Sequence, residues 1–276
     1  MALKYKLLAM DIDDTLLPRG GVISEANKKA IKAAEDAGVY VTIATGRGFL
    51  GSKKVWSELG LNKLIINYGG AMINDAATGK PFFVTELEPE TVTYILDLAE
   101  ALDLHVHLYQ GDEIVYEHEH LYGTLYSEAL SLPKRIEPMI RRMTWRNVPK
   151  VLIITEPERV KDLMPYFQEK LKGLAAVSAS SPGFIEFNTI GANKGTALLK
   201  LAEHLGVSRD ETAAIGDNTL DLEMIELAGL GCCVEDGNEL VKSAASVIAP
   251  PCREDGVKWF IDNYIINLSE RSSIND

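Results

Sequence analysis

Residues 6–17 read KLLAMDIDDTLL, and this stretch decides the fold. Its first five residues, Lys6–Met10, form a short and mostly apolar run, which is typical of a buried parallel strand. Three aspartates, Asp11, Asp13 and Asp14, follow at once. Ligands of open α/β sheets bind outside the carboxyl ends of the strands, so Asp11 and Asp13 are candidates for an active site. The same aspartates are also typical of a turn after a strand, and this segment alone does not separate the two interpretations.

Composition limits the class of protein and its partners. The chain has 276 residues, of which 46% are hydrophobic, so it is long enough for one large domain or two moderate ones. A formal net charge of -12 argues against nucleic acid and anionic membranes as partners, because both need a basic surface. No apolar run has the length of a membrane span, and the amino terminus lacks the pattern of a signal peptide. Three cysteines do not make a disulfide framework. We therefore expect a globular cytoplasmic protein.

Alternating strand and helix patterns flank a region of different character. A helical period from Ser24 to Ala37 leads to an apolar strand at Val39–Thr45, and the same alternation resumes at Asn193. The region between them contains strands with hairpin spacing as well as helices. We therefore expect an α/β core domain with a parallel sheet, interrupted by an inserted α+β domain. The expected boundaries are 1–83 and 189–276 for the core and 84–188 for the insert, with a polar, frayed end at 269–276.

A second stretch has the same pattern as the first, with aspartates directly after an apolar strand. Residues Gly216–Asp221 read GDNTLD, in which an apolar strand runs directly into Asp217, and Asp221 lies one helical turn further on. Crowded carboxylates repel one another, and a divalent cation among them removes that repulsion. Oxygen ligands of this kind suit Mg²⁺, which keeps several waters and shares phosphate oxygens. The spacing therefore predicts a magnesium site.

A phosphate is the natural partner for such a site. Mg²⁺, the ammonium of Lys194 and the hydroxyl of Thr45 together could neutralise three phosphoryl oxygens. Asp11 would then attack phosphorus in line and form an aspartyl phosphate. Asp13 would donate a proton to the leaving oxygen and later take one from water. Lys194 could instead be an ordinary lysine at a helix start, but a cation is unfavourable beside that end of the helix dipole, which favours a functional role.

Four short motifs resemble those of the haloacid dehalogenase-like phosphatases. They are D-x-D-x-T-L at Asp11–Leu16, T-G-R at Thr45–Arg47, N-K-G at Asn193–Gly195 and G-D-N-x-x-D at Gly216–Asp221, in this order. The large insert between the second and third motifs is similar to that of the Cof-type subgroup, which has an α/β cap. The resemblance spans nearly the whole chain. It implies a Rossmann-like parallel-sheet core with an inserted α+β cap domain.

The resemblance implies a role for each motif residue. Asp11 is implied to be the nucleophile and a metal ligand, and Asp13 the acid/base and, through its backbone carbonyl, a metal ligand. Asp217 is implied to bind Mg²⁺, and Asp221 is implied to support the residues that bind it. The expected metal-site residues are therefore Asp11, Asp13, Asp217 and Asp221. Arg47 could equally be an ordinary surface residue. The expected phosphate- or substrate-binding residues are Thr45, Gly46, Arg47, Lys194 and Asn218.

Two positions depart from the subgroup pattern. Asp14 stands where the subgroup usually has glycine, and Leu220 stands where it usually has asparagine. The family's contact with phosphate or substrate at this position therefore does not carry over to Leu220. Asn218, two residues earlier, is the nearest residue that could replace it.

The insert also carries four histidines, His105, His107, His118 and His120. Their spacing invites a zinc interpretation, but no cysteine or suitably spaced acid completes such a site. We expect them to pack within the cap or to contact substrate.

The sequence therefore predicts a Mg²⁺-dependent phosphatase that acts on a small phosphorylated metabolite. Transfer of the phosphoryl group to an acceptor sugar, as in phosphosugar mutases, is the alternative within enzymes. A phosphoacceptor or binding module without rapid turnover is the alternative from another class, and the presence of Asp13 disfavours it. Sugar phosphates, phosphoglycolate and nucleotide-derived phosphates all stay open as substrates, and no pattern marks an oligomeric state.

Overall fold

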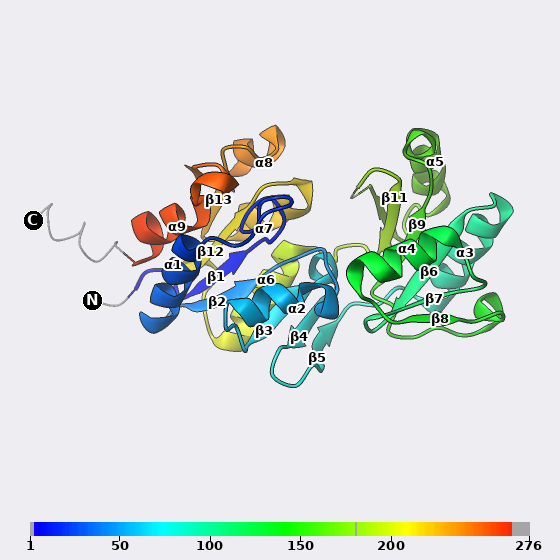
Figure 1. The fold of residues 1–276 in the computed structure, drawn as a ribbon, viewed down its shortest axis with the longest axis horizontal. Helices are drawn as coiled ribbons and strands as arrows, with labels where there is room; N and C mark the ends of the chain where they lie inside the picture. Colours follow the sequence, from blue (N-terminus) through cyan, green and yellow to red (C-terminus); the bar gives the residue numbers. More distant parts are fainter. Residues whose placement is uncertain (1–2, 180, 267–276) are drawn as a thin grey trace, which may run out of the picture. The chain divides into compact units, whose positions relative to one another are not determined.

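The computed structural model describes residues 3–179 and 181–266, and the predicted frayed end at 269–276 lies outside them. The chain divides into two compact units, and Figure 1 draws the helices and strands of both. The sequence-based boundaries differ from this division at residues 48–51, 83 and 189–192. No helix among the described residues is both long and apolar enough to cross a membrane. The first unit comprises Met1–Arg47, Ser52–Phe82 and Asn193–Asp276, and the second Gly48–Gly51 and Phe83–Ala192.

A five-stranded parallel sheet forms the centre of the first unit, with the strand order β14-β13-β12-β1-β2 (Figure 1). All residues of β1 and β12 are buried, which explains why both strands read as continuous apolar runs rather than alternating ones. The predicted parallel-sheet core is confirmed. The strands are β1 (Leu7–Met10), β2 (Tyr40–Ile43), β12 (Thr212–Gly216), β13 (Leu230–Val234) and β14 (Val247–Ala249).

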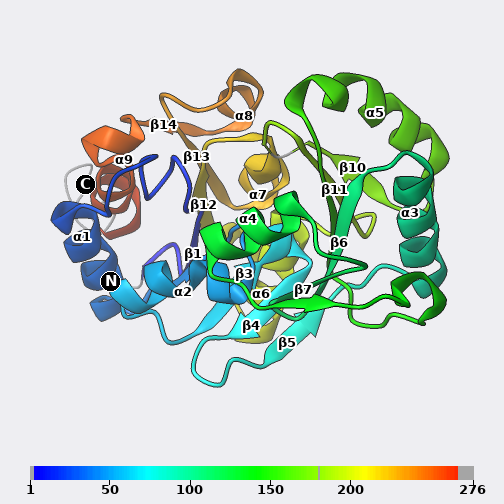
Figure 2. The same cartoon turned by 45° about the vertical axis from the view of Figure 1, so that its right-hand side comes forward.

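Helices cover both faces of this sheet. α1 (Glu25–Asp36) and α9 (Gly256–Phe260) lie on one side, and α6 (Lys194–Leu205) and α7 (Leu222–Leu227) lie on the other (Figure 2). Ser24 caps α1, because its hydroxyl accepts the backbone N–H of Asn27 at 3.0 Å. This part of the chain also contains α2 (Phe49–Glu58), α8 (Glu239–Ala244) and a three-stranded sheet of β3 (Leu64–Asn67), β4 (Met72–Asp75) and β5 (Pro81–Val84).

The second unit is built on a six-stranded sheet with the order β10-β11-β9-β6-β7-β8. Neighbouring strands are antiparallel except for β7 and β8, which are parallel. The hairpin of β6 and β7 turns at Gly111, whose positive φ of 61° suits a tight turn between paired strands. The strands are β6 (His105–Gln110), β7 (Glu113–Tyr116), β8 (Lys134–Ile136), β9 (Lys150–Ile154), β10 (Ala176–Ser178) and β11 (Phe184–Asn188).

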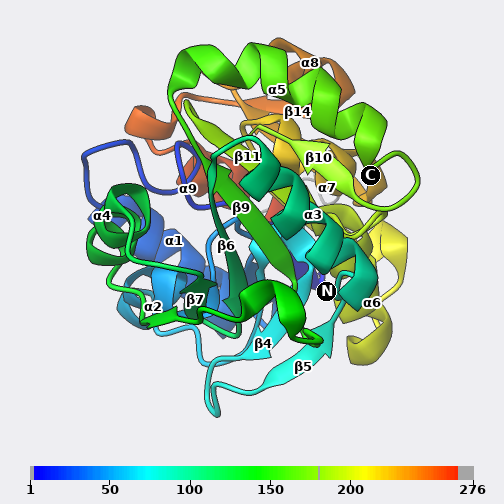
Figure 3. The same cartoon turned by 90° about the vertical axis from the view of Figure 1, so that its right-hand side faces the viewer.

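The two faces of this second sheet differ in character. α3 (Pro89–Ala101) and α5 (Pro157–Lys170) cover one face and enclose the hydrophobic core of the unit, which includes Leu108 of β6 and Phe167 of α5 (Figures 2 and 3). Figure 3 views the unit from the side that carries these two helices. α4 (Leu121–Leu130) lies on the other side of the sheet (Figure 2).

α4 approaches the sheet closely at one glycine. A Cβ added at Gly123 would come within 2.8 Å of the His105 ring and 2.9 Å of the Tyr116 ring. Residues alternate between the two faces along a strand, so β6 directs His105 and His107 toward α4 and Leu108 toward α3. The face beneath α4 therefore contains buried polar side chains.

Candidate active site

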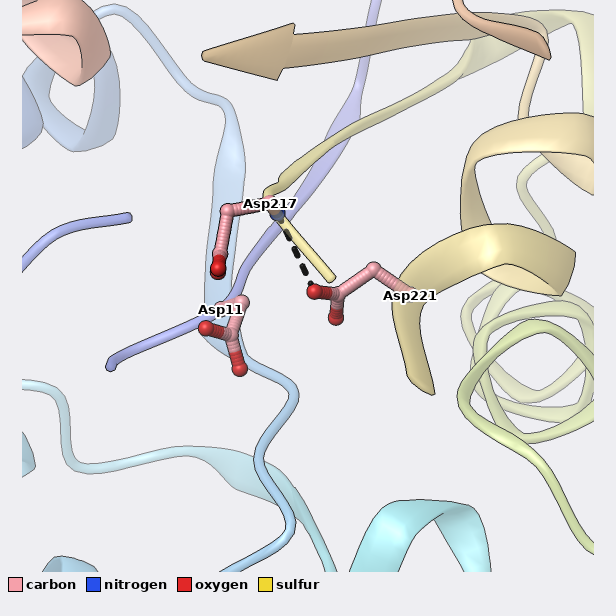
Figure 4. Close-up of side chains that lie close together, drawn as sticks. All are labelled: Asp11, Asp217 and Asp221. Carbon is pink, nitrogen blue, oxygen red and sulfur yellow. Dashed lines mark hydrogen bonds between the residues drawn. The ribbon is translucent and has the colours of Figure 1, made fainter. Parts of the chain in front are cut away.

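The carboxyl ends of β1 and β12 bring the two acidic stretches together. Met10 pairs with Ile215 in the sheet, so Asp11 and Asp217 follow neighbouring strands at the same edge. Asp11, Asp217 and Asp221 each offer a carboxylate oxygen, and these oxygens all lie within 4.8 Å of one another. Figure 4 shows the carboxylates of Asp11 and Asp217 side by side and that of Asp221 directed at the backbone of Asp217. Two parts of the chain about 200 residues apart in sequence thus form one acidic site.

Lys194 lies at the centre of this site. It is the first residue of α6, whose start is held by a capping box of Asn193 and Thr196. Its ammonium donates to Asp11 Oδ1 at 2.5 Å and to Asp221 Oδ1 at 2.6 Å. Burial alone lowers the pKa of Lys194, but attraction from Asp11 and then Asp221 outweighs burial, so the pKa lies above its ordinary value. The lysine is therefore charged at neutral pH although it is buried.

Asp221 has both carboxylate oxygens engaged. Oδ1 accepts from Lys194, and Oδ2 accepts the backbone N–H groups of Asp217 and Asn218 at 3.1 Å each. The strand tip can approach this carboxylate only because residue 216 is glycine, since a Cβ there would lie 2.5 Å from the Cβ of Asp221. Asp221 thus holds the tip of β12 and the lysine in place.

The site has more negative than positive charge. Three buried or half-buried carboxylates face one ammonium, which leaves two uncompensated negative charges when all are ionised. Burial, followed by repulsion from Asp221, raises the pKa of Asp11 well above its ordinary value despite the ion pair with Lys194. The same two causes raise the pKa of Asp217 to about 6. The folded protein therefore holds these acids in their charged form only at a cost.

The donor set fits a divalent cation. Asp11 Oδ2 is buried and has no hydrogen-bond partner among the described residues, whereas Asp11 Oδ1 is bound to Lys194. Asp217 has one oxygen bound by the hydroxyl of Thr15 at 2.7 Å. An oxygen from each of these two aspartates is thus left for a hard cation such as Mg²⁺, which prefers carboxylate and water ligands. Sequence reasoning gave Thr15 no role, although it is the threonine of the D-x-D-x-T motif.

Asp13 and Arg47 form a second pair at the more exposed side of the site. Arg47 donates from Nε to one oxygen of Asp13 at 2.9 Å and from a terminal nitrogen to the other at 2.5 Å. Thr45 is fully buried, and its hydroxyl accepts the backbone N–H of Arg47 at 3.1 Å. The predicted acid/base and the arginine of the T-G-R motif are therefore in direct contact.

The structure also shows the surroundings of two further predicted residues, Gly46 and Asn218, and of the two divergent positions, Asp14 and Leu220. A Cβ added at Gly46 would lie 3.7 Å from the side chain of Leu220, so these two residues pack together. Asn218 uses its side-chain oxygen to accept the backbone N–H of Leu220 at 2.9 Å. Asp14 has a left-handed φ of 60°, which glycine adopts easily and aspartate tolerates. Its carboxylate accepts two hydrogen bonds from Arg19 at 3.0 and 2.7 Å.

Gly70 supports the site from outside it. This residue has a φ of 100°, and a Cβ on it would lie 2.1 Å from the carbonyl oxygen of Asn193 and 2.7 Å from the backbone nitrogen of Lys194. The backbone at Gly70 thus packs directly against the start of α6. The sequence shows only a turn glycine here, because the contact joins residues more than 100 positions apart.

The histidines of the second unit lie beneath or beside α4. His105 Nε2 and His107 Nδ1 are 3.2 Å apart, and the rings of His105 and His120 are stacked with centroids 4.7 Å apart. Among the described residues, only Asp11, Asp217 and Asp221 form a group of three or more possible ligands close enough to hold a metal ion. His105, His107 and His120 pack together instead.

Comparisons with known proteins agree with this geometry. A sequence profile of the haloacid dehalogenase-like hydrolases matches residues 8–261. A 5-amino-6-(5-phospho-D-ribitylamino)uracil phosphatase from Bacillus subtilis is 30% identical over 96% of this chain and 99% of its own. An HMP-PP phosphatase from Yersinia pseudotuberculosis is 28% identical over 95% of this chain and 96% of its own.

A solved structure leads to the same family. The crystal structure of a haloacid dehalogenase-like hydrolase from Bacteroides thetaiotaomicron superposes with a TM-score of 0.84 and 29% identity, covering 94% of this chain and 98% of the other. The match extends over both units of the fold. Together with the four motifs, the paired acidic strand ends and the buried lysine, it establishes that the chain belongs to the haloacid dehalogenase-like hydrolases.

Proposed function

We propose that this haloacid dehalogenase-type phosphatase requires Mg²⁺ and hydrolyses small phosphorylated metabolites through an aspartyl phosphate on Asp11. The observation that carries the proposal is the acidic surplus around Lys194, with one buried oxygen of Asp11 that has no partner among the described residues. The names of two relatives support the substrate class, because each describes a phosphatase of a small phosphorylated compound. The cytoplasmic location stays a prediction from the sequence.

The chemistry assigned to each residue follows from its surroundings. Bound Mg²⁺ supplies positive charge that offsets the carboxylates and the phosphoryl oxygens. Asp11 and Asp217 would hold it, together with the backbone carbonyl of Asp13 that the family resemblance implies, and Asp221 supports this shell through the backbone of Asp217. Lys194 fixes Asp11 by one oxygen and adds a buried positive charge where phosphoryl charge develops.

The reaction proceeds in two displacements at phosphorus. One carboxylate oxygen of Asp11 bonds to phosphorus while the bond to the leaving oxygen breaks, and Asp13 gives its proton to that oxygen. Water then attacks the aspartyl phosphate, Asp13 accepts a proton from it, and Asp11 leaves as a carboxylate. Arg47 holds both oxygens of Asp13 as an ion pair, so this contact must loosen before Asp13 carries a proton. The guanidinium can then turn toward the incoming phosphate.

Hydrolysis of p-nitrophenyl phosphate tests the proposal. We expect activity with Mg²⁺ that is lost on chelation and lost in Asp11→Asn, because the amide is a poor nucleophile. Asp14→Asn is the matched control, since Asp14 lies three residues away and pairs with Arg19 rather than Lys194. Activity that survives both chelation and Asp11→Asn would refute the assignment.

Two further measurements separate the alternative functions. Release of inorganic phosphate from a panel of phosphorylated metabolites supports hydrolysis, whereas formation of an isomeric phosphosugar supports a mutase. An aspartyl phosphate that persists after mixing with a phosphate donor supports a phosphoacceptor module. The same panel, run with wild type and Asp11→Asn, identifies the preferred substrate.

A further inference from the structure

Thr15 makes the one side-chain contact to the carboxylate of Asp217 among the described hydrogen bonds. It is fully buried in the turn after β1, and its hydroxyl donates to Asp217 Oδ1 at 2.7 Å. The two residues are 202 positions apart in the chain. Backbone hydrogen bonds from Leu16 and Leu17 to the carbonyl of Ile12, at 3.0 and 2.8 Å, hold the turn. The hydroxyl is therefore presented from a rigid backbone.

This contact completes the immobilisation of Asp217. The backbone N–H of Asp217 donates to Asp221, and its carbonyl accepts the backbone N–H of Asn238 at 2.7 Å. Those two bonds fix the main chain but leave the carboxylate free to rotate. The hydroxyl of Thr15 stops that rotation, because it commits Oδ1 and leaves Oδ2 as the oxygen available to a cation.

We propose that Thr15 is a positioning residue that sets the affinity of the site for its divalent cation by holding the carboxylate of Asp217. The inference rests on the proposed function, because it requires that Asp217 binds the cation. Groups that orient a metal ligand from behind typically contribute about 10- to 100-fold to metal affinity. Thr15 itself touches neither the cation nor the substrate.

Isothermal titration of the full chain with Mg²⁺, without substrate, tests this role. Thr15→Val keeps the shape of the side chain but removes the donor, and we expect it to weaken Mg²⁺ binding about 10- to 100-fold. Thr15→Ser keeps the donor, and its affinity should stay within about threefold of wild type because the hydrogen bond can still form. Thr212→Val is the matched control: Thr212 is equally buried, but its hydroxyl bonds to the carbonyl of Arg209 at 2.6 Å, at the opposite end of β12.

A double-mutant cycle separates a specific role from a general loss of structure. If Thr15 acts through Asp217, Thr15→Val should weaken Mg²⁺ binding no further in a background that already carries Asp217→Asn. Thermal unfolding measures whether each variant is folded. If Thr15→Val is not folded, Thr15→Ala replaces it in the titration. Wild-type affinity in folded Thr15→Val or Thr15→Ala, or equal weakening by Thr212→Val, overturns the inference.

The proposed function fails in a different way. A wild-type protein that binds no Mg²⁺ and hydrolyses no phosphate ester overturns both the function and the role of Thr15. A wild-type protein that does both, with a valine variant of unchanged affinity, overturns only the role of Thr15.

Discussion

Each of the two units buries a lysine against a carboxylate, but the two pairs are built differently. In the first unit the ammonium of Lys194 lies 2.5 Å from a carboxylate oxygen of Asp11 and also forms an ion pair with Asp221. In the second unit Lys150 of β9 lies 2.5 Å from Glu186 of β11, one ammonium to one carboxylate on neighbouring antiparallel strands. The first cluster has a surplus of negative charge, whereas the second pair is balanced.

This difference separates a cluster that needs a ligand from an ion pair that needs none. A balanced pair needs no further charge, because each ion satisfies the other and desolvation is the only cost. A surplus of buried carboxylates stays unfavourable until a cation or a proton joins them, which is why burial raises the pKa of Asp11 and Asp217. Burial of charge is thus common to both units, but only the first cluster requires a partner.

Replacing the two lysines is the strongest test of this comparison. Lys194→Met should reduce the kcat for phosphate release by at least about 10²- to 10³-fold, because it removes a preorganised positive charge from the reacting centre. Lys150→Met, compared at equal folded fraction, should retain kcat within about tenfold, since Lys150 forms its ion pair with Glu186 of the second sheet and not with an acid of the first cluster. Loss of kcat in a folded Lys150→Met protein would place the second pair in the active site as well.

Substitutions in the Lys150–Glu186 pair should change the free energy of unfolding. Lys150→Met alone removes the ammonium that Glu186 contacts in the buried pair, and should lower the free energy of unfolding by about 3–5 kcal/mol because a buried charge loses this counter-ion. The double variant Lys150→Met/Glu186→Leu should recover most of that loss, because apolar residues often replace a buried ion pair at little cost. Urea unfolding of the three proteins measures both effects. A double variant as unstable as the single one would mean that the charges themselves stabilise the second sheet.

The two units should also respond to pH in opposite directions. Asp217 has a folded pKa of about 6, above the value of 3.8 expected when unfolded, so its contribution to stability is present below pH 3.8 and lost as pH rises through 6. This loss amounts to at most about 3 kcal/mol in the metal-free protein. Burial lowers the pKa of His105 from 6.5 to about 3, so its contribution is present above pH 6.5 and lost as pH falls toward 3. The loss at pH 5 should be about 2 kcal/mol.

Thermal unfolding from pH 4 to 8 measures these opposite slopes. Saturating Mg²⁺ should raise the stability at pH 7 more than at pH 5, because protons compete with the cation for Asp217. His105→Gln should flatten the acid side of the profile and leave the effect of Mg²⁺ unchanged. A Mg²⁺ effect that is equal at both pH values would argue against Asp217 as a cation ligand.

Local patterns predicted most of the core and missed the parts that depend on distant contacts. The strand patterns around Asp11 and Asp217 suffice because parallel strands end at one edge of a sheet, so acids that follow them meet there. The helix at α4 was not predicted, because its apolar residues Leu121 and Leu125 are exposed while small residues such as Gly123 face the sheet. Such a helix has no apolar stripe for a sequence pattern to detect.

The supporting residues of the site were missed for a related reason. Thr15 and Gly70 act through contacts with residues more than 100 positions away, and neither stands out by residue type. A buried threonine in a turn and a glycine in another turn are common in any fold. Only the pairing of β1 with β12, and the packing of residue 70 against α6, gives them their positions.

The packing at Gly70 makes the enzyme vulnerable at a place that bears no reactive group. A side chain at this position cannot fit against the start of α6 unless that helix moves, and the lysine that α6 begins with would move with it. A variant with any larger residue there would keep every aspartate of the site and still be inactive. In a survey of natural variants, such a chain would still contain all four sequence motifs and would be mistaken for an active phosphatase.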